Sequence, residues 1–359
     1  MKQRLVIIGG GQSGLAAGRA ARDAGWDPVL LEAGDRPAGS WPAYYDSLTL
    51  FSPAAYSGFP GYAFPGRPDR YPVRDEVVAF LTGYAGWLGI DLRTGTRVVD
   101  VTAAGRGFEV RTEAGDVLGA DAVVAASGSF GNPVRPAFPG RDSYGGEVLT
   151  AAEYRSPDRF AGRRVVVVGA GNSAVQVAYE LSETAQVSLA VRSPVQFVPQ
   201  VRGGRDLHYW LHTLRLDLLP PSVLARLFQG TLVFDDGRYR SAIDSGRLDQ
   251  RPVFSGFTET GVRWADGATE AVDAVILATG YRPSLPYLTG IGAFTPDGRP
   301  LHRQGLSVTH PGLGFLGLEF QRSFSSNTLR GVHRDATYLI KALGRRTTET
   351  TRVTASKGK

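Results

Sequence analysis

The sequence predicts a three-layer α/β fold in which one Rossmann-like dinucleotide-binding unit is inserted into another. Two observations support this fold class: a strand–turn–helix–strand pattern occurs twice, and each copy is followed by a second, similar apolar strand. Glycine is also frequent, at 46 of 359 residues. That share is about 13%, against the usual ~7%, and it indicates close backbone approaches.

Each copy of the pattern consists of a short apolar strand, a glycine-rich turn, a helix and a second apolar strand. In the first copy the strand spans 4–8, the turn 9–14, the helix runs to about 24, and the second strand spans 28–31. In the second copy the corresponding elements are 164–168, 169–174, a helix to about 184, and 187–191. One such turn alone is weak support, but here the strand and helix flank it twice.

The glycines of each turn have separate roles. The first permits the tight bend, the second lets a pyrophosphate approach the backbone, and the third lets the helix pack on the strand. The helix N-terminus presents free N–H groups and a partial positive charge to the phosphates. The expected cofactor-binding positions are Gly9, Gly11, Ser13 and Gly14 in the first turn, and Gly169, Gly171, Asn172 and Ser173 in the second.

The residue that ends the second strand distinguishes the two copies. Glu32 lies 23 positions after Gly9, and Arg192 lies 23 positions after Gly169. A carboxylate there accepts hydrogen bonds from a ribose 2′-hydroxyl and repels a 2′-phosphate, whereas an arginine pairs with that phosphate. The first unit therefore suits FAD (or NAD), and the second suits NADPH, with Ser193 as an additional donor. A solvated strand end is the alternative interpretation of Arg192.

A second pair of similar segments indicates how the units are connected. The segments 121–128 and 273–280 are apolar strands that end at Gly128 and Gly280, both expected to lie near a cofactor. We therefore expect a discontinuous FAD domain, 1–155 plus 281–344, that ends in a helix over about 328–343. The NADPH domain is expected to span 156–280, and 345–359 to form a basic tail without regular structure.

Composition excludes several classes of protein. The chain has no cysteine, which excludes disulfides, thiol chemistry and cysteine-ligated metals. The net charge of +6 falls to +2 without the last fifteen residues, so the body has no nucleic-acid signature. No apolar run is long enough to cross a membrane, and an N-terminal strand leaves no room for a signal peptide. We expect a cytoplasmic protein with no metal, nucleic-acid or membrane partner.

An aromatic loop follows the first unit. It contains eight aromatic residues among prolines and glycines: Trp41, Tyr44, Tyr45, Phe51, Tyr56, Phe59, Tyr62 and Phe64. Contact with a flavin or an apolar substrate is one explanation, and ordinary loop packing is the other. Further along the chain, His208 and His212 have i, i+4 spacing, but no third ligand lies nearby in sequence, so we expect a packing or surface role.

The motifs together resemble flavin-containing monooxygenases, in particular the compact bacterial members that oxidise thioethers. The resemblance covers nearly the whole chain and includes segments 39–41, 45–48, 71–72, 278–281 and 328–332. It implies that Gly39, Ser40, Trp41, Val98, Thr328 and Leu329 join the cofactor-binding set. Phe51 and Tyr45 are the candidates at the flavin or substrate site, and no acid–base residue is evident.

The chain departs from the family pattern at three positions, of which the change of phenylalanine to Tyr144 is mild. The family motif F-x-G-x-x-x-H-x-x-x-(F/Y) falls on Tyr144, Gly146, Thr150 and Tyr154, so threonine replaces the histidine. Tyr154 distinguishes the chain from Baeyer–Villiger enzymes, which have tryptophan there. Phe51 occupies the place of an asparagine that, in many members, holds the nicotinamide and the flavin peroxide. The lifetime of a peroxide is therefore in question, although binding of either cofactor is not.

The resemblance implies a monooxygenase that uses FAD, NADPH and O2, with NADH left open as a second donor. A flavin C4a-hydroperoxide would oxygenate a small organic sulfide or amine to the sulfoxide or N-oxide, and a homodimer is left open. The first alternative is a thioredoxin-reductase-like NADPH:ferredoxin or quinone reductase without redox cysteines. The second is a non-catalytic flavoprotein that acts as a sensor, which the paired and oppositely charged fingerprints disfavour.

Overall fold

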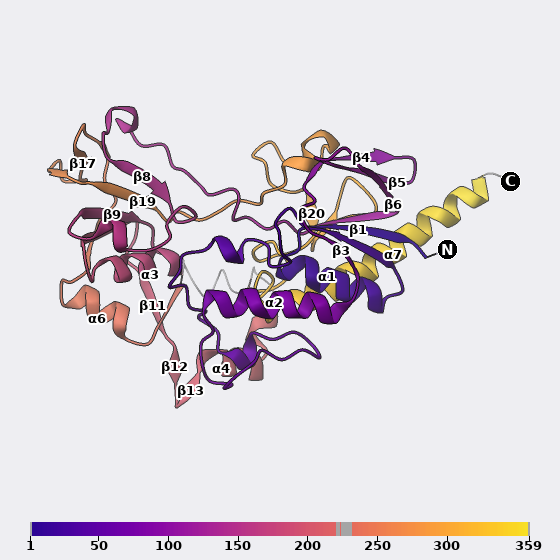
Figure 1. The fold of residues 1–359 in the computed structure, drawn as a ribbon, viewed down its shortest axis with the longest axis horizontal. Helices are drawn as coiled ribbons and strands as arrows, with labels where there is room; N and C mark the ends of the chain where they lie inside the picture. Colours follow the sequence, from indigo (N-terminus) through magenta and orange to yellow (C-terminus); the bar gives the residue numbers. More distant parts are fainter. Residues whose placement is uncertain (1, 220–222, 224–231, 358–359) are drawn as a thin grey trace.

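The computed structural model describes the main chain of residues 2–219, 223 and 232–357, and side chains as far as 346. Its described part contains two sheets of mainly parallel strands, at opposite ends of an elongated molecule (Figure 1). The first sheet has the order β20-β21-β22-β7-β1-β2-β3. Its strands are β1 (Arg4–Ile8), β2 (Asp27–Leu31), β3 (Asp91–Arg93), β7 (Ala122–Ala125), β20 (His302–Arg303), β21 (Leu306–Ser307) and β22 (Leu313–Phe315).

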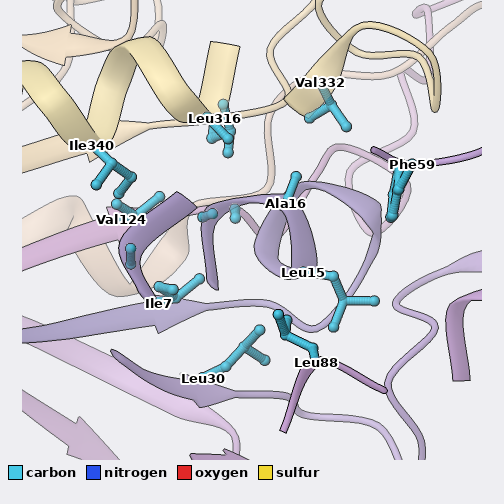
Figure 2. Close-up of a cluster of buried hydrophobic side chains, with 14 of the residues drawn as sticks. Ile7, Leu15, Ala16, Leu30, Phe59, Leu88, Val124, Leu316, Val332 and Ile340 are labelled. Atoms are coloured by element: carbon cyan, nitrogen blue, oxygen red, sulfur yellow. The ribbon is translucent and has the colours of Figure 1, made fainter. Parts of the chain in front are cut away.

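The first sheet is covered on both faces. Alternate residues of β1 enter different cores, because successive side chains of a strand point to opposite faces. Leu5 and Ile7 pack with α1 (Gln12–Asp23), α2 (Arg74–Leu88) and α7 (Val332–Lys357), as Figure 2 shows for Ile7 among Leu15, Leu30 and Ile340. Val6 and Ile8 pack instead against a small antiparallel sheet of β4 (Val98–Ala104), β5 (Gly107–Thr112) and β6 (Val117–Ala120).

The second sheet repeats this arrangement with the order β15-β10-β9-β19-β8. Its strands are β8 (Glu147–Thr150), β9 (Arg164–Val168), β10 (Gln186–Val191), β15 (Asp249–Pro252) and β19 (Ala274–Leu277). The helices α3 (Asn172–Leu181) and α6 (Arg238–Asp244) share one core with Val165 and Val167. Val166 and Val168 contribute to another, beside the small sheet of β16 (Gly256–Phe257), β17 (Gly261–Arg263) and β18 (Thr269–Ala271). Both units are therefore three-layered, which confirms the predicted fold class.

The remaining elements form an extension of the second unit toward the first. Strand β11 (Gln196–Pro199) pairs in parallel with β14 (Leu232–Asp235), and β12 (Val201–Arg202) forms a hairpin with β13 (Arg205–Asp206). The short helix α4 (Leu207–Thr213) and the 3-10 helix η5 (Leu216–Leu218) follow this hairpin. This extension lies below the centre of the molecule, beside α2, in Figure 1.

Two linkers join the units, one after β7 that contains Gly128 and one after β19 that contains Gly280, and they run beside each other. Backbone hydrogen bonds connect them: the N–H of Val134 donates to the oxygen of Gly280, and the N–H of Ser284 donates to that of Gly128, each at 2.9 Å. The sequence pattern places the first boundary at 155/156, but β8 pairs with β19 over Glu147–Thr150 and so lies in the second sheet. The reason is that the middle of the family motif, Glu147–Thr150, forms a strand, which the sequence pattern did not reveal.

The C-terminal helix is longer than expected. It runs over Val332–Lys357, whereas the sequence analysis ends it near Leu343 and leaves 345–359 without structure. The stretch 345–357 contains no glycine or proline, so nothing in it breaks a helix. Arg346 also anchors this part of the helix by donating to the carbonyl oxygen of Ser307 at 2.9 Å. Among the described residues, no helix is long and apolar enough to cross a membrane.

Candidate cofactor sites

The first glycine-rich turn is packed too tightly for any side chain at two of its positions. A Cβ atom at Gly9, which has φ +106°, would lie 2.7 Å from the carbonyl oxygen of Ala126. A Cβ atom at Gly14 would lie 1.7 Å from the carbonyl oxygen of Gly9. Gly9 therefore lets the end of β1 lie close to the end of β7. Gly14 lets α1 pack against the end of β1, which is the role that the sequence analysis expects of the third glycine.

Gly11 faces the loop that begins at Gly39. A Cβ atom at Gly39 (φ +54°) would lie 2.8 Å from the Cα atom of Gly11, so this loop lies directly against the turn. Gly11 is the N-cap of α1 and carries no side-chain cap, so the first N–H groups of the helix are left for an anion. Ser13 is buried, and its hydroxyl oxygen would lie only 2.2 Å from a Cβ atom at Gly317, so Gly317 leaves room for it. Gly317 escaped the sequence analysis because it belongs to no fingerprint.

Glu32 is buried at the end of β2, and its carboxylate faces the turn. One oxygen accepts a hydrogen bond from the N–H of Gly10, and the other accepts one from the N–H of Gly34 at 2.6 Å. A carboxylate has about four lone-pair sites, so two remain for hydroxyl donors. The arrangement fits the ribose of a dinucleotide whose pyrophosphate lies at Gly11.

A glutamine in the turn joins two other segments of the expected site. Gln12 donates to the carbonyl oxygen of Asn327 at 2.6 Å, and its own amide oxygen accepts a hydrogen bond from the Trp41 indole at 3.2 Å. Segments 39–41 and 327–329 are thereby brought to the turn. Thr328 donates to Ser325, whereas Leu329 is buried in the core beneath α1 and α7. Gln12 was missed because its position in the fingerprint accepts any residue.

Three further predicted positions lie around the first unit and its linkers. Val98, at the start of β4, is buried in the same core cluster as Val29 and Leu31. Gly128 (φ +71°) and Gly280 (φ +88°) lie in the linkers, and a Cβ atom at either would meet nothing within 4 Å. Backbone conformation therefore requires these two glycines, and open space lies beside them.

The second glycine-rich turn packs against the neighbouring strand as the first turn does. The first residue of its helix, however, is bonded to another strand. Gly169 has φ +143°, and a Cβ atom there would lie 2.3 Å from the carbonyl oxygen of Ala278. Gly171 is the N-cap of α3, again without a side-chain cap, and Ser173 is partly buried in the first helical turn. The Asn172 side chain donates to the oxygen of Leu232 at 3.3 Å and accepts from the N–H of Phe234 at 3.2 Å. The Asn172 amide therefore holds β14 beside the start of α3.

Arg192 and Ser193 are exposed directly after β10. Within the part of the chain that the structure describes, no residue forms a hydrogen bond or ion pair with the Arg192 guanidinium. Arg164 provides a contrast, because it is held by Glu270 at 2.7 Å and by Ser188 at 2.7 Å. Arg192 therefore has its donors free for an anion at the position that the fingerprint assigns to a 2′-phosphate.

The two aromatic candidates lie in different surroundings. Tyr45 is 2% exposed and packs in the core of the second unit, where its hydroxyl donates to Gln176 on α3. Burial raises the pKa of Tyr45. Phe51 is partly buried, and its ring stacks on Phe234, with centroids 5.1 Å apart, and on His208, at 6.1 Å.

The imperfect family motif is part of the second unit. The hydroxyl of Tyr144 donates to the oxygen of Val272 at 2.7 Å, and that of Tyr154 donates to Glu180 at 2.8 Å. Thr150, which replaces the histidine, is fully buried, and its N–H and hydroxyl both donate to Glu153. Its hydrogen bonds are therefore local to the end of β8.

The two histidines both contact one tyrosine ring: the centroid of Tyr56 is 6.1 Å from that of His208 and 5.9 Å from that of His212. His208 is buried and bonded to Asp206 at 2.8 Å. Among the described residues, no group of three or more histidine, aspartate or glutamate side chains is arranged to hold a metal ion.

The fold and the two turns define a protein with two dinucleotide-binding units, and comparison with known proteins specifies it further. Residues 6–217 match the family of pyridine nucleotide-disulphide oxidoreductases, to which the chain belongs. An uncharacterized oxidoreductase CzcO-like from Geobacillus kaustophilus is 31% identical, over 94% of this chain and 97% of that protein. Indole-3-pyruvate monooxygenase YUCCA1 of Oryza sativa subsp. japonica is 33% identical, over 82% of this chain and 80% of that enzyme.

Solved structures agree with these relatives. The flavin-containing monooxygenase from Stenotrophomonas maltophilia superimposes with a TM-score of 0.84 at 32% identity, covering 96% of this chain and 99% of that one. The chain is accordingly an FAD-dependent monooxygenase that draws electrons from NADPH and uses O2. The expected family resemblance is thus confirmed, and the alternative of a ferredoxin or quinone reductase is not favoured.

Proposed function

We propose that this monooxygenase binds FAD in the first unit and NADPH in the second, and oxygenates a small organic sulfide or amine. The observation that supports this assignment is a difference between the two residues that follow the second strand of each unit, Glu32 and Arg192. Glu32 is buried and anchored by two backbone N–H groups, whereas Arg192 is exposed and its guanidinium has no partner among the residues that the structure describes. A ribose fits the first, and a 2′-phosphate fits the second.

The residues that would hold FAD come from four segments. Gly11 and the start of α1 would receive the pyrophosphate, Glu32 the ribose, and Gln12 would keep Trp41 and Asn327 together at the turn. When bound, FAD supplies the chemistry: it accepts a hydride from the nicotinamide and, once reduced, activates O2. The protein then has to orient the two cofactors and exclude water.

The aromatic loop is suited to the second of these tasks. Asp46, an acidic residue of this loop, has a side chain that is 61% exposed and ion-paired with Arg74, so its charge lies at the surface. Phe51 adds a hydrocarbon ring where many family members have an amide. We therefore infer that the substrate face is dry and largely apolar, which suits a soft nucleophile such as a sulfide. A cytoplasmic location and a homodimer belong to the same proposal.

The test is to measure oxygenated product against NADPH consumed. Purified holoenzyme is given NADPH in air with methyl p-tolyl sulfide, N,N-dimethylbenzylamine or indole-3-pyruvate as separate probes. We expect sulfoxide, and to a lesser extent N-oxide, in amounts that approach the NADPH oxidised, with little hydrogen peroxide. Conversion of indole-3-pyruvate alone would contradict the sulfide and amine class, and peroxide as the only product from every probe would contradict the proposed site.

A further inference from the structure

Asp206 joins the two dinucleotide-binding units. It ends the β12–β13 hairpin of the second unit, and its carboxylate accepts four hydrogen bonds. Tyr71, from the first unit, and Gln200, at 2.7 Å, donate to one oxygen. The other oxygen accepts the N–H of His208 at 2.7 Å and lies 2.8 Å from Nδ1 of the same residue. Donors from both units therefore converge on one carboxylate, which is 14% exposed.

The hydrogen bonds define the protonation of this pair. Burial opposes the charge of Asp206, but the bonds from His208, Tyr71 and Gln200 hold its pKa below the usual range. An ionised carboxylate only accepts, so Nδ1 of His208 carries the proton. Burial lowers the pKa of His208, and the charged groups that face it are Asp206, Arg330 and Asp217. His208 is thus neutral, and its buried Nε2 has no partner among the described residues.

Phe51 is attached to this pair through both its backbone and its ring. Gln200 Nε2, which donates to Asp206, also donates to the carbonyl oxygen of Phe51 at 3.0 Å. The Phe51 ring stacks on the imidazole of His208, with centroids 6.1 Å apart and planes at 25°. Phe234, on β14, covers both rings, at 5.1 Å from Phe51 and 5.7 Å from His208.

We propose that Asp206 is a positioning residue that, through Gln200 and His208, holds Phe51 at the reacting face of the flavin. The inference rests on the proposed function, in which Phe51 lies at that face. Phe51 has no polar group on its side chain, so it acts through its position, by excluding water and by shaping the space between the two cofactors. A displaced ring admits water, and the two electrons of the reduced cofactor then pass to O2 and leave as hydrogen peroxide, so that no oxygen atom reaches the substrate.

The experiment compares two variants of this cluster with a matched control, all as holoenzyme. Asp206→Asn keeps the shape but replaces one accepting oxygen with a donor, and Gln200→Leu removes the link to Phe51. The control is Glu180→Gln, which changes another carboxylate that accepts a tyrosine hydroxyl, from Tyr154 at 2.8 Å. The readouts are the ratio of peroxide to sulfoxide per NADPH consumed, the visible circular dichroism of bound FAD with and without NADP+, and the melting temperature.

We expect Asp206→Asn and Gln200→Leu to raise the ratio of peroxide to sulfoxide by about tenfold, since small displacements in an active site have large effects. The circular dichroism of bound FAD is expected to change as well. The same ratio and spectrum in these variants as in Glu180→Gln would overturn the inference. If Asp206→Asn does not fold, Gln200→Leu and Tyr71→Phe decide the matter by the same readouts.

A further variant separates this inference from the proposed function. Phe51→Ala is expected to change the peroxide ratio and the FAD spectrum by itself. If Phe51→Ala matches the parent, the placement of Phe51 beside the flavin is wrong, and the inference fails with it. If Phe51→Ala differs but the Asp206 and Gln200 variants do not, the placement stands and the role of Asp206 is wrong.

Discussion

The carboxylate of Glu32 accepts a hydrogen bond from the backbone N–H of Gly10, so the end of β2 is bonded directly to the glycine-rich turn. Two consecutive parts of a dinucleotide site, one for the ribose and one for the phosphates, are thereby held in a fixed relation before any ligand arrives. Preorganisation of this kind lowers the entropic cost of binding the cofactor.

Glu32→Gln is expected to weaken FAD binding. One carboxylate oxygen becomes an NH2 group that faces a backbone N–H of Gly10 or Gly34, so a donor opposes a donor. The loss of a charge-assisted hydrogen bond costs about 1.5–3 kcal/mol, or roughly tenfold to a hundredfold in Kd. Fluorescence titration of the FAD-depleted protein measures this change. Glu109→Gln, on the exposed side of β5, is the control, and an equal Kd for both variants would contradict the role of Glu32.

Arg192→Ala is expected to raise KM for NADPH while leaving KM for NADH almost unchanged. The guanidinium has no protein partner in the described structure, so its removal leaves no buried group unsatisfied. The loss of its bond to a 2′-phosphate is expected to cost about 1.5–3 kcal/mol. Steady-state kinetics with both cofactors measures the ratio of KM for NADPH to KM for NADH. Arg263→Ala, exposed on β17, should leave it unaltered, and equal effects of Arg192→Ala on both cofactors would show that Arg192 does not recognise the phosphate.

Two alanine substitutions in the first turn are expected to have different consequences. At Gly14, a Cβ atom 1.7 Å from the oxygen of Gly9 forces α1 away from β1, so Gly14→Ala should not yield folded protein. At Gly11, the Cβ atom would lie 3.5 Å from Gly39, an ordinary contact, and φ is −74°. Gly11→Ala should therefore fold but bind FAD weakly, because the methyl group occupies the approach of the pyrophosphate.

Far-ultraviolet circular dichroism and the flavin content of the purified variants test this pair. Folded Gly14→Ala protein with a normal flavin content would show that α1 can move away from β1 without loss of the site. A Gly11→Ala variant that retains full FAD affinity would place the pyrophosphate elsewhere.

The elements that the sequence predicts well are those with local signals. Strand β1 was expected at 4–8 and β9 at 164–168, and both lie there, because continuous apolar runs before a glycine-rich turn leave few alternatives. Glu32 and Arg192 likewise lie at the strand ends that their spacing indicates. These features depend on fewer than thirty consecutive residues each.

The features that the sequence does not reveal depend on residues far apart in the chain. Tyr71 and Asp206 are bonded across 135 positions, and Gln12 reaches Asn327 across 315. Asn172 fits a phosphate-binding fingerprint, yet its amide is bonded to β14, which only the tertiary structure brings beside α3. No single-sequence pattern encodes such pairings, because each partner has an ordinary local context.

The acid sensitivity of the folded protein is expected to depend on His333. Burial, together with the neighbouring Arg334, lowers the pKa of His333 to about 4. The folded state therefore favours the neutral imidazole, while the unfolded chain takes up a proton near pH 6.5. Its stabilising contribution is complete above about pH 6.5 and is lost as the pH falls toward 4, with an upper limit of about 3 kcal/mol.

His333→Gln, which carries no titratable group, should accordingly flatten the fall in melting temperature of the holoenzyme between pH 7 and pH 5. Some of the fall should remain, since burial also lowers the pKa of His208 and produces a dependence of the same sign. His310→Gln, in the turn after β21, is the control and should follow the parent curve. If the His333→Gln curve also follows that of the parent, the imidazole of His333 is protonated as readily in the folded protein as in the unfolded chain. The acid sensitivity would then have to arise elsewhere.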